Sequence, residues 1–130
     1  MGNRPEGIAL NAGGCGVRGF VTNPTTLSGI GGVTIILTRY DNMGNVIGTS
    51  TCVTDATGFY SFGGLAAGNY SVTEDVSTLP LGYMAKGSSV GTVGGATDGT
   101  APSFTLLSGV VLNSGDAGIN YDFTAGPVTG

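Results

Sequence analysis

Residues 54–74, TDATGFYSFGGLAAGNYSVTE, decide the fold that we expect for this chain. Two runs of aromatic and β-branched residues, 59–62 and 69–74, have the composition of short strands. The Ala-Ala-Gly sequence at 66–68 turns the chain between them. The Asp-Ala-Thr-Gly sequence at 55–58 predicts a tight turn ahead of them, because Asp can bond the nearby backbone and Gly tolerates positive φ. The stretch therefore predicts consecutive β-strands joined by tight turns.

The rest of the chain repeats this pattern and shows no helical periodicity, because Gly or Pro interrupts each stretch of a dozen residues. Further strands are expected at 16–23, 33–40, 46–54, 104–112 and 119–123. We expect the Gly-rich stretch 86–102 to be a loop. Many short strands divided by turn residues are typical of a β-sandwich or β-barrel.

Alternation along the strands predicts which side chains face the core. Val33, Ile35 and Leu37 alternate and are expected to point inward. In the following strand, the same rule assigns Ile47 and Val53 to the core. The residues between these strands, 41–45, predict a hairpin turn.

The charge content excludes several functions. Charged residues make up 9 % of the chain, against roughly 25 % in ordinary soluble domains. The four basic residues are scattered, so nucleic acid is not an expected partner. The chain has no His, which removes Ser-His and Cys-His nucleophile systems and the usual catalytic zinc sites. We therefore expect no enzyme activity and no cofactor.

The surface composition and the apolar pattern indicate where the protein works. A surface kept wet by Ser, Thr, Asn and Gly rather than by charge is typical of extracellular modules, and the expected location is the cell surface. No apolar run approaches 18 residues, so no helix is expected to span a membrane. The first six residues lack the apolar stretch of a signal peptide, which indicates either a signal removed with Met1 added or an excised domain.

A family resemblance rests on four segments, which are 32–38, 54–74, 79–83 and 112–123. Together they resemble the SdrD B-like repeat domains of serine–aspartate-repeat surface proteins and the related Cna B-type domains. The likeness runs from about Val17 to Phe123. It implies an Ig-like, prealbumin-like Greek-key β-sandwich of about seven to eight strands.

The resemblance also divides the chain into three parts. Residues 1–15 are expected to be an N-terminal extension, either docked or exchanged as a strand. Residues 16–125 are expected to be the β-sandwich, and residues 126–130 a tail or linker.

Relatives of the Cna B-type often carry an internal isopeptide bond between a Lys and an Asn or Asp, assisted by a buried acid. Glu74 matches the place of that acid. The first strand carries Arg18 where a Lys is expected, and the single lysine, Lys86, lies late in the chain. Because a guanidinium is not an amine nucleophile, no isopeptide bond is expected. Glu74 is instead expected to be a half-buried, satisfied carboxylate, with Arg18 as its candidate partner.

Several relatives also bind calcium in a loop between the first two strands. Calcium takes six to eight oxygen ligands, usually including several carboxylates, and the equivalent loop here, 23–32, contains no acid. Asp41, Asn42 and Asn45 form the best remaining cluster, with one carboxylate. Calcium is therefore possible but not supported, and the simpler interpretation is that each Asp caps a turn.

The two cysteines, Cys15 and Cys52, predict a disulfide, because an even pair in an exported, loop-rich domain favours one. If Ile47 and Val53 face the core, Cys52 points outward. The bridge would then tie the segment before the first strand to the outside of a sheet. A bridge between neighbouring subunits is the alternative, and two free thiols are the third possibility.

Three functional hypotheses follow from these observations. The first is a non-catalytic structural or adhesive module whose partners are neighbouring domains or identical subunits. The second is a self-assembling subunit of an extracellular filament or sheath. In that case the weakly alternating segment 7–12, with Ile8 and Leu10 as interface candidates, is donated to a neighbour's sheet edge. The third and weakest is a carbohydrate-binding module, for which no site is marked. Asn69 also begins a glycosylation sequon.

Overall fold

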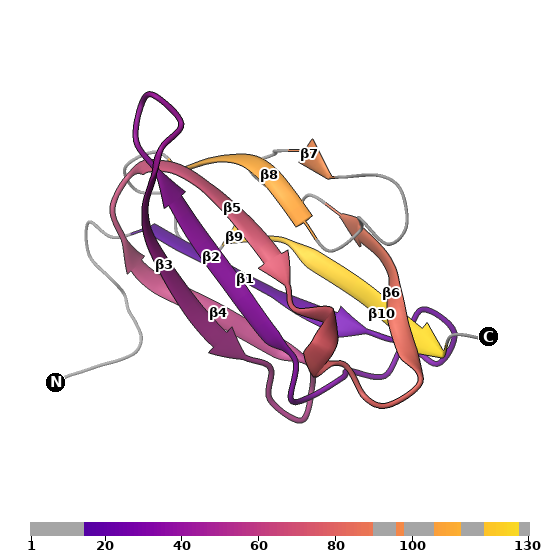
Figure 1. The fold of residues 1–130 in the computed structure, drawn as a ribbon. Coiled ribbons are helices and arrows are strands. Elements are labelled where there is room, and N and C mark those ends of the chain that lie inside the picture. Colours follow the sequence, from indigo (N-terminus) through magenta and orange to yellow (C-terminus); the bar gives the residue numbers. More distant parts are fainter. Residues whose placement is uncertain (1–14, 90–95, 98–105, 113–118, 128–130) are drawn as a thin grey trace, which may run out of the picture.

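The protein is a sandwich of two β-sheets in a computed structural model that describes residues 15–89, 96–97, 106–112 and 119–127 (Figure 1). The first sheet has the order β4 (Phe59–Leu65), β1 (Cys15–Thr22), β10 (Asp122–Pro127) and β6 (Tyr83–Ser89), with β9 (Ile119–Asn120) also paired to β1. The second sheet has the order β3 (Val46–Val53), β2 (Thr34–Tyr40), β5 (Gly68–Glu74), β8 (Leu106–Leu112) and β7 (Ala96–Thr97). A 3-10 turn, η1 (Val76–Thr78), follows β5. The predicted all-β sandwich is confirmed.

Strand pairing between distant parts of the chain gives the Greek-key topology. β1 pairs in parallel with β10 and antiparallel with β4, so the first and last long strands are neighbours. The second sheet is antiparallel throughout, and β2 lies between β3 and β5. The chain crosses repeatedly from one sheet to the other, which encloses one core between the layers.

The core contains Val, Ile and Leu side chains with a small group of buried aromatic residues. Tyr60 is 1 % exposed, and its hydroxyl donates to the backbone carbonyl of Tyr121 at 2.6 Å. β1 passes close to this carbonyl at Gly19, where a Cβ atom would lie only 1.7 Å from the Tyr121 oxygen. Glycine at this position therefore allows the close approach that the Tyr60 hydrogen bond and the buried Tyr121 require.

The predicted turn at 55–58 is confirmed, and it connects the two sheets. Asp55 accepts hydrogen bonds from the backbone N–H of Thr57 at 2.8 Å and of Phe59 at 3.2 Å. Gly58 has φ +84°, the left-handed conformation that glycine adopts easily. The preceding residue, Thr54, is buried, and its hydroxyl donates to the Ile30 carbonyl at 2.7 Å. The turn is therefore held from both ends by side-chain bonds to the backbone.

The face assigned to β3 was wrong. Ile47 and Val53 are 55 % and 58 % exposed, whereas Cys52 packs against the core. The reason is the pairing register, which places Cys52 opposite Ile35, an inward-facing residue with no exposed surface. Because side chains alternate along a strand, Ile47 and Val53 then lie on the outer face.

The loop expected at 86–102 was also partly wrong, because β6 continues to Ser89. Ala85 is the buried residue of this strand, so the sequence offers no alternating apolar signal. β6 is held by antiparallel pairing with β10, from Tyr83 opposite Pro127 to Ser89 opposite Asp122. The information that fixes this strand thus lies more than thirty residues away in the sequence.

Candidate functional site

The most unusual chemical group in the described core is the carboxyl group of Glu74, the last residue of β5. It faces inward opposite Ile35 and is 2 % exposed. Neither carboxylate oxygen has a hydrogen-bond partner among the described residues. Burial raises the pKa of this carboxyl group to about 8 from its ordinary 4.5, because the charged form loses its hydration. Glu74 is therefore mostly protonated at neutral pH.

The expected pairing of Glu74 with Arg18 was wrong. Arg18 is exposed on β1, whereas its neighbour Val17 is the residue that points into the core. The expectation of a half-buried carboxylate with a hydrogen-bond partner was also wrong, because Glu74 is fully buried and unpaired within the described chain. Lys86 lies half-buried on β6, and among the described residues β1 offers no amine beside Glu74. The absence of an isopeptide bond stays a prediction.

The hairpin between β2 and β3 holds the three residues considered for calcium. The Asp41 carboxylate accepts from the backbone N–H of Asn45 and of Met43 and from the Asn45 side-chain amide, at 2.9, 2.8 and 3.2 Å. These bonds, the one from the Asn45 backbone first, lower the pKa of Asp41. The structure thus brings Asp41 and Asn45 together as a turn-capping pair. No group of three or more acidic, Cys or His side chains that could hold a metal occurs in the described part of the chain.

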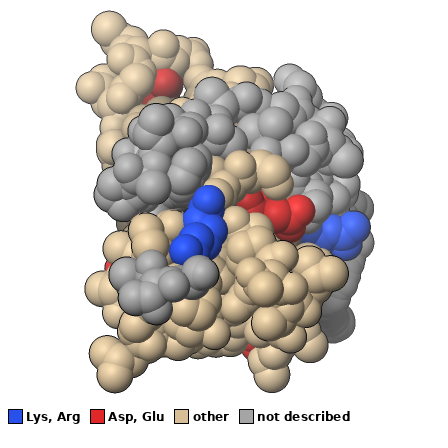
Figure 2. Space-filling model, turned by 90° about the vertical axis from the view of Figure 1, so that its right-hand side faces the viewer, with Lys and Arg blue, Asp and Glu red and all other residues tan. Residues whose placement is uncertain are grey.

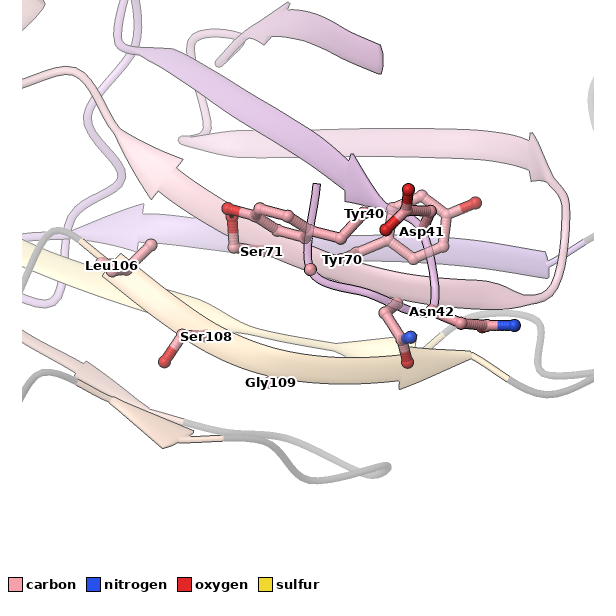
Figure 3. A pocket seen from close by; sticks show the side chains of 10 residues that line it. Tyr40, Asp41, Asn42, Tyr70, Ser71, Leu106, Ser108 and Gly109 are labelled. Atoms are coloured by element: carbon pink, nitrogen blue, oxygen red, sulfur yellow. Dashed lines mark hydrogen bonds between the residues drawn. The ribbon is translucent and has the colours of Figure 1, made fainter. Parts of the chain in front are cut away.

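An open groove of about 460 Å³ lies beside this hairpin on the outer face of the second sheet (Figure 3). Tyr40 and Leu106 line it, and the Tyr40 hydroxyl lies 3.0 Å from the hydroxyl of the buried Ser71. Asn42 and the glycosylation candidate Asn69 also line the groove. Sequence reasoning did not find this groove, because its lining comes from three strands and a turn. The carbohydrate-binding hypothesis stays a prediction, and this groove is where we would test it.

The two cysteines lie on different sheets. Cys15 begins β1 opposite Leu65, the last residue of β4, whereas Cys52 is the second-last residue of β3, near the turn that leads into β4. The length of β4 therefore separates their backbones (Figure 1). Cys52 carries a free, half-buried thiol in this structure. The Cys15–Cys52 bridge stays a prediction, whether within one chain or between chains.

An exposed edge strand is the other feature that sequence reasoning missed. Seven of the eight residues of β3 are exposed, including the apolar side chains of Val46, Ile47 and Val53. β3 and the hairpin residues 42–45 before it contain no charged residue. The interface candidates Ile8 and Leu10 fall outside the described residues.

Charge is sparse elsewhere on the surface as well. Figure 2 shows a side of the molecule on which a few basic and acidic side chains lie among mostly uncharged residues. Among the described residues, no helix is long and apolar enough to cross a membrane.

Two solved structures show the same fold at low sequence identity. The full-length major pilin SpaD from Corynebacterium diphtheriae has 17 % identity and a TM-score of 0.51, and the match covers 85 % of this chain and 30 % of that one. The major plantain pollen allergen Pla l 1 has 15 % identity and a TM-score of 0.51, with 85 % and 89 % covered. This chain thus spans less than a third of the pilin. Since a pilin and a pollen allergen match equally, these likenesses identify the fold alone.

Sequence comparison identifies the family. No curated protein matches this chain. The family described as the SdrD B-like domain matches over residues 19–125, which includes most of both sheets and Glu74. The predicted family is confirmed: the chain belongs to the SdrD B-like domains.

Proposed function

We propose that this chain is a non-catalytic structural module of an extracellular, cell-surface protein or appendage. The observation that carries this proposal is its membership of the SdrD B-like domain family over residues 19–125. The geometry agrees with it, because the titratable groups with clearly shifted pKa values do not meet in an open cleft. Glu74 and Tyr60 are buried in the core, while Asp41 and Asp55 cap separate turns. Nothing in the described chain therefore resembles a cleft with converging catalytic groups.

The partners of such a module are other proteins, either neighbouring domains of a longer chain or identical subunits. A surface with few charges supports this, because burying it in an interface desolvates few ions. The second candidate, a subunit of an extracellular filament or sheath, is favoured by the exposed, uncharged strand β3.

Localisation on intact cells tests the proposal. An antibody against the folded domain should label the surface of intact producing cells, and protease added outside should remove the signal. A cytosolic control protein should survive the same treatment. Labelling that requires permeabilised cells, together with protection from external protease, would refute a cell-surface module.

A further inference from the structure

β3 is an edge strand that the rest of the sandwich leaves uncovered. Among the described strands it pairs with β2 alone, so its other edge presents backbone N–H and C=O groups without strand partners. Gly48 and Ser50, which lie opposite the inward-facing Arg39 and Leu37, are also exposed. The opposing sheet therefore does not close over β3, which is open along its edge and over most of both faces.

The other described edges carry features that discourage strand addition. β4 has an irregularity at Gly63–Gly64, where Gly64 has φ +65° and the register with β1 shifts. β7 is two residues long, and β6 contains Lys86. Bulges, short strands and lysine are the usual means of blocking edge-to-edge pairing. β3 is not short and has no lysine, since it is eight residues long, uncharged and free of Pro. Its register with β2 shifts once, near its start between Val46 and Gly48, and residues 48–53 form a regular edge.

The segment 7–12, GIALNA, matches this edge in chemistry and length. It carries no charge, as β3 carries none, so pairing them desolvates no ion. Ile8, Leu10 and Ala12 alternate, so an added strand would place one apolar row beside the exposed Ile47 and Val53. Six residues of strand span about 20 Å, which is also the length of the regular part of β3, residues 48–53.

Chain geometry indicates that the segment comes from a second molecule. Residue 12 is three residues before Cys15, so their Cα atoms can be at most about 11 Å apart. Cys15 lies on β1, one strand inside the β4 edge, whereas β3 lies in the other layer and contacts β4 (Figure 1). Measured from Cys15, the position beyond β3 is displaced by one layer, about 10 Å, and by two strand spacings of about 4.8 Å each. The two displacements are perpendicular, so together they amount to about 14 Å. The complete segment 7–12 thus cannot reach the β3 edge of its own chain.

We propose that the free edge of β3 binds residues 7–12 of a second copy of this chain as an added strand. Donor and acceptor are different surfaces, so each molecule can use both at once and the contact repeats head to tail. Contacts of this kind form open filaments when the rotation does not close a ring. This inference rests on the proposed function as a structural module and adds the partner and the edge that it binds.

The test uses the full chain and two variants, one with a substitution in the acceptor strand and one with substitutions in the donor segment. Ile47→Lys blocks the acceptor edge, and Ile8→Asp with Leu10→Asp blocks the donor. Val111→Lys is the matched control, because Val111 is 46 % exposed but lies on β8, an inner strand of the same sheet. Assembly is followed by light scattering with size-exclusion chromatography and by negative-stain electron microscopy. Circular dichroism and urea unfolding show that each variant is folded.

We expect wild type and Val111→Lys to form filaments or head-to-tail oligomers. Each blocked variant should need at least about tenfold more protein to assemble. A mixture of the two blocked variants should form dimers and stop there, because it contains one working donor–acceptor pair. Assembly by folded Ile47→Lys at the wild-type concentration would overturn the proposal and leave the proposed function standing. Assembly of the donor-blocked variant alone would point to β3–β3 pairing and overturn it too. A wild type that stays monomeric at millimolar concentration would also overturn it, while surface localisation would remain a separate result.

Discussion

The buried carboxyl group of Glu74 predicts a stability that falls as pH rises. Its pKa in the folded protein is about 8, above its ordinary value of 4.5, so the folded state holds the proton more tightly than the unfolded state does. Below pH 4.5 both states are protonated and the full stability is present. Between pH 4.5 and 8 the unfolded state ionises first and draws the equilibrium toward unfolding. Above pH 8 both states are ionised and the loss is complete.

The size of the effect follows from the two pKa values. A difference of about 3.5 pH units, at 1.36 kcal/mol per unit, corresponds to a total loss of about 5 kcal/mol, of which about 3 kcal/mol is already lost at pH 7. Because the chain has no His, few other groups titrate in this window. The lowered pKa values of Asp41 and Asp55 affect stability only below about pH 4. The slope between pH 5 and 7.5 therefore reports mainly on Glu74.

Urea unfolding between pH 4.5 and 8 measures this slope. Wild type should lose on average about 1.2 kcal/mol of unfolding free energy per pH unit between pH 5 and 7.5. Glu74→Gln keeps the shape of the side chain and removes the titration, so its curve should be nearly flat. Asp75→Asn, at the neighbouring, less buried carboxylate, should keep the wild-type slope. Parallel curves for wild type and Glu74→Gln would refute the assignment of a protonated, buried Glu74.

Three further predictions concern the core and the cysteines. Gly19→Ala should destabilise the fold by about 3 kcal/mol or more, since its Cβ would lie 1.7 Å from the Tyr121 carbonyl oxygen, and a urea midpoint near wild type would contradict this close approach. Tyr60→Phe should cost about 1–3 kcal/mol, because it removes the 2.6 Å hydrogen bond to the same buried carbonyl, and a loss below about 0.5 kcal/mol would mean that the bond contributes little. Mass spectrometry with and without reductant tests the Cys15–Cys52 bridge: a bridge within one chain gains hydrogen mass on reduction, a bridge between chains separates into monomers, and an unchanged mass contradicts both.

Local features of this fold could be predicted from the sequence because their causes are local. The turn at 55–58 follows from Asp55 bonding the backbone of the next residues and from Gly58 adopting positive φ. The inward direction of Val33, Ile35 and Leu37 follows from alternation along one strand, and all three are buried. These inferences depend on neighbours within a few residues, so the sequence contains everything needed to make them.

The surroundings of the Glu74 carboxyl group and the existence of β6 could not be predicted, because both depend on distant strand pairing. Sequence suggested an ionic partner for Glu74 in Arg18, but the alternation of β1 directs Val17 inward and leaves Arg18 exposed. In β6, Ala85 is the buried residue, so the strand exists through its hydrogen bonds to β10. A residue's position on a strand thus indicates its face only after the register of that strand is known.

The error on β3 and the proposal for its edge have the same physical origin. Val46, Ile47, Cys52 and Val53 allow two alternating assignments, and β-branched residues on both faces fit either one. Apolar alternation normally means that one face is covered, yet here the register gives the core face to Cys52 and leaves the larger apolar side chains in solvent. A strand with strand-like composition and no layer over it is expected where the missing cover comes from another molecule. Blocking the edge at Ile47 without loss of folding is therefore the change that separates a surface built for assembly from an edge that is merely exposed.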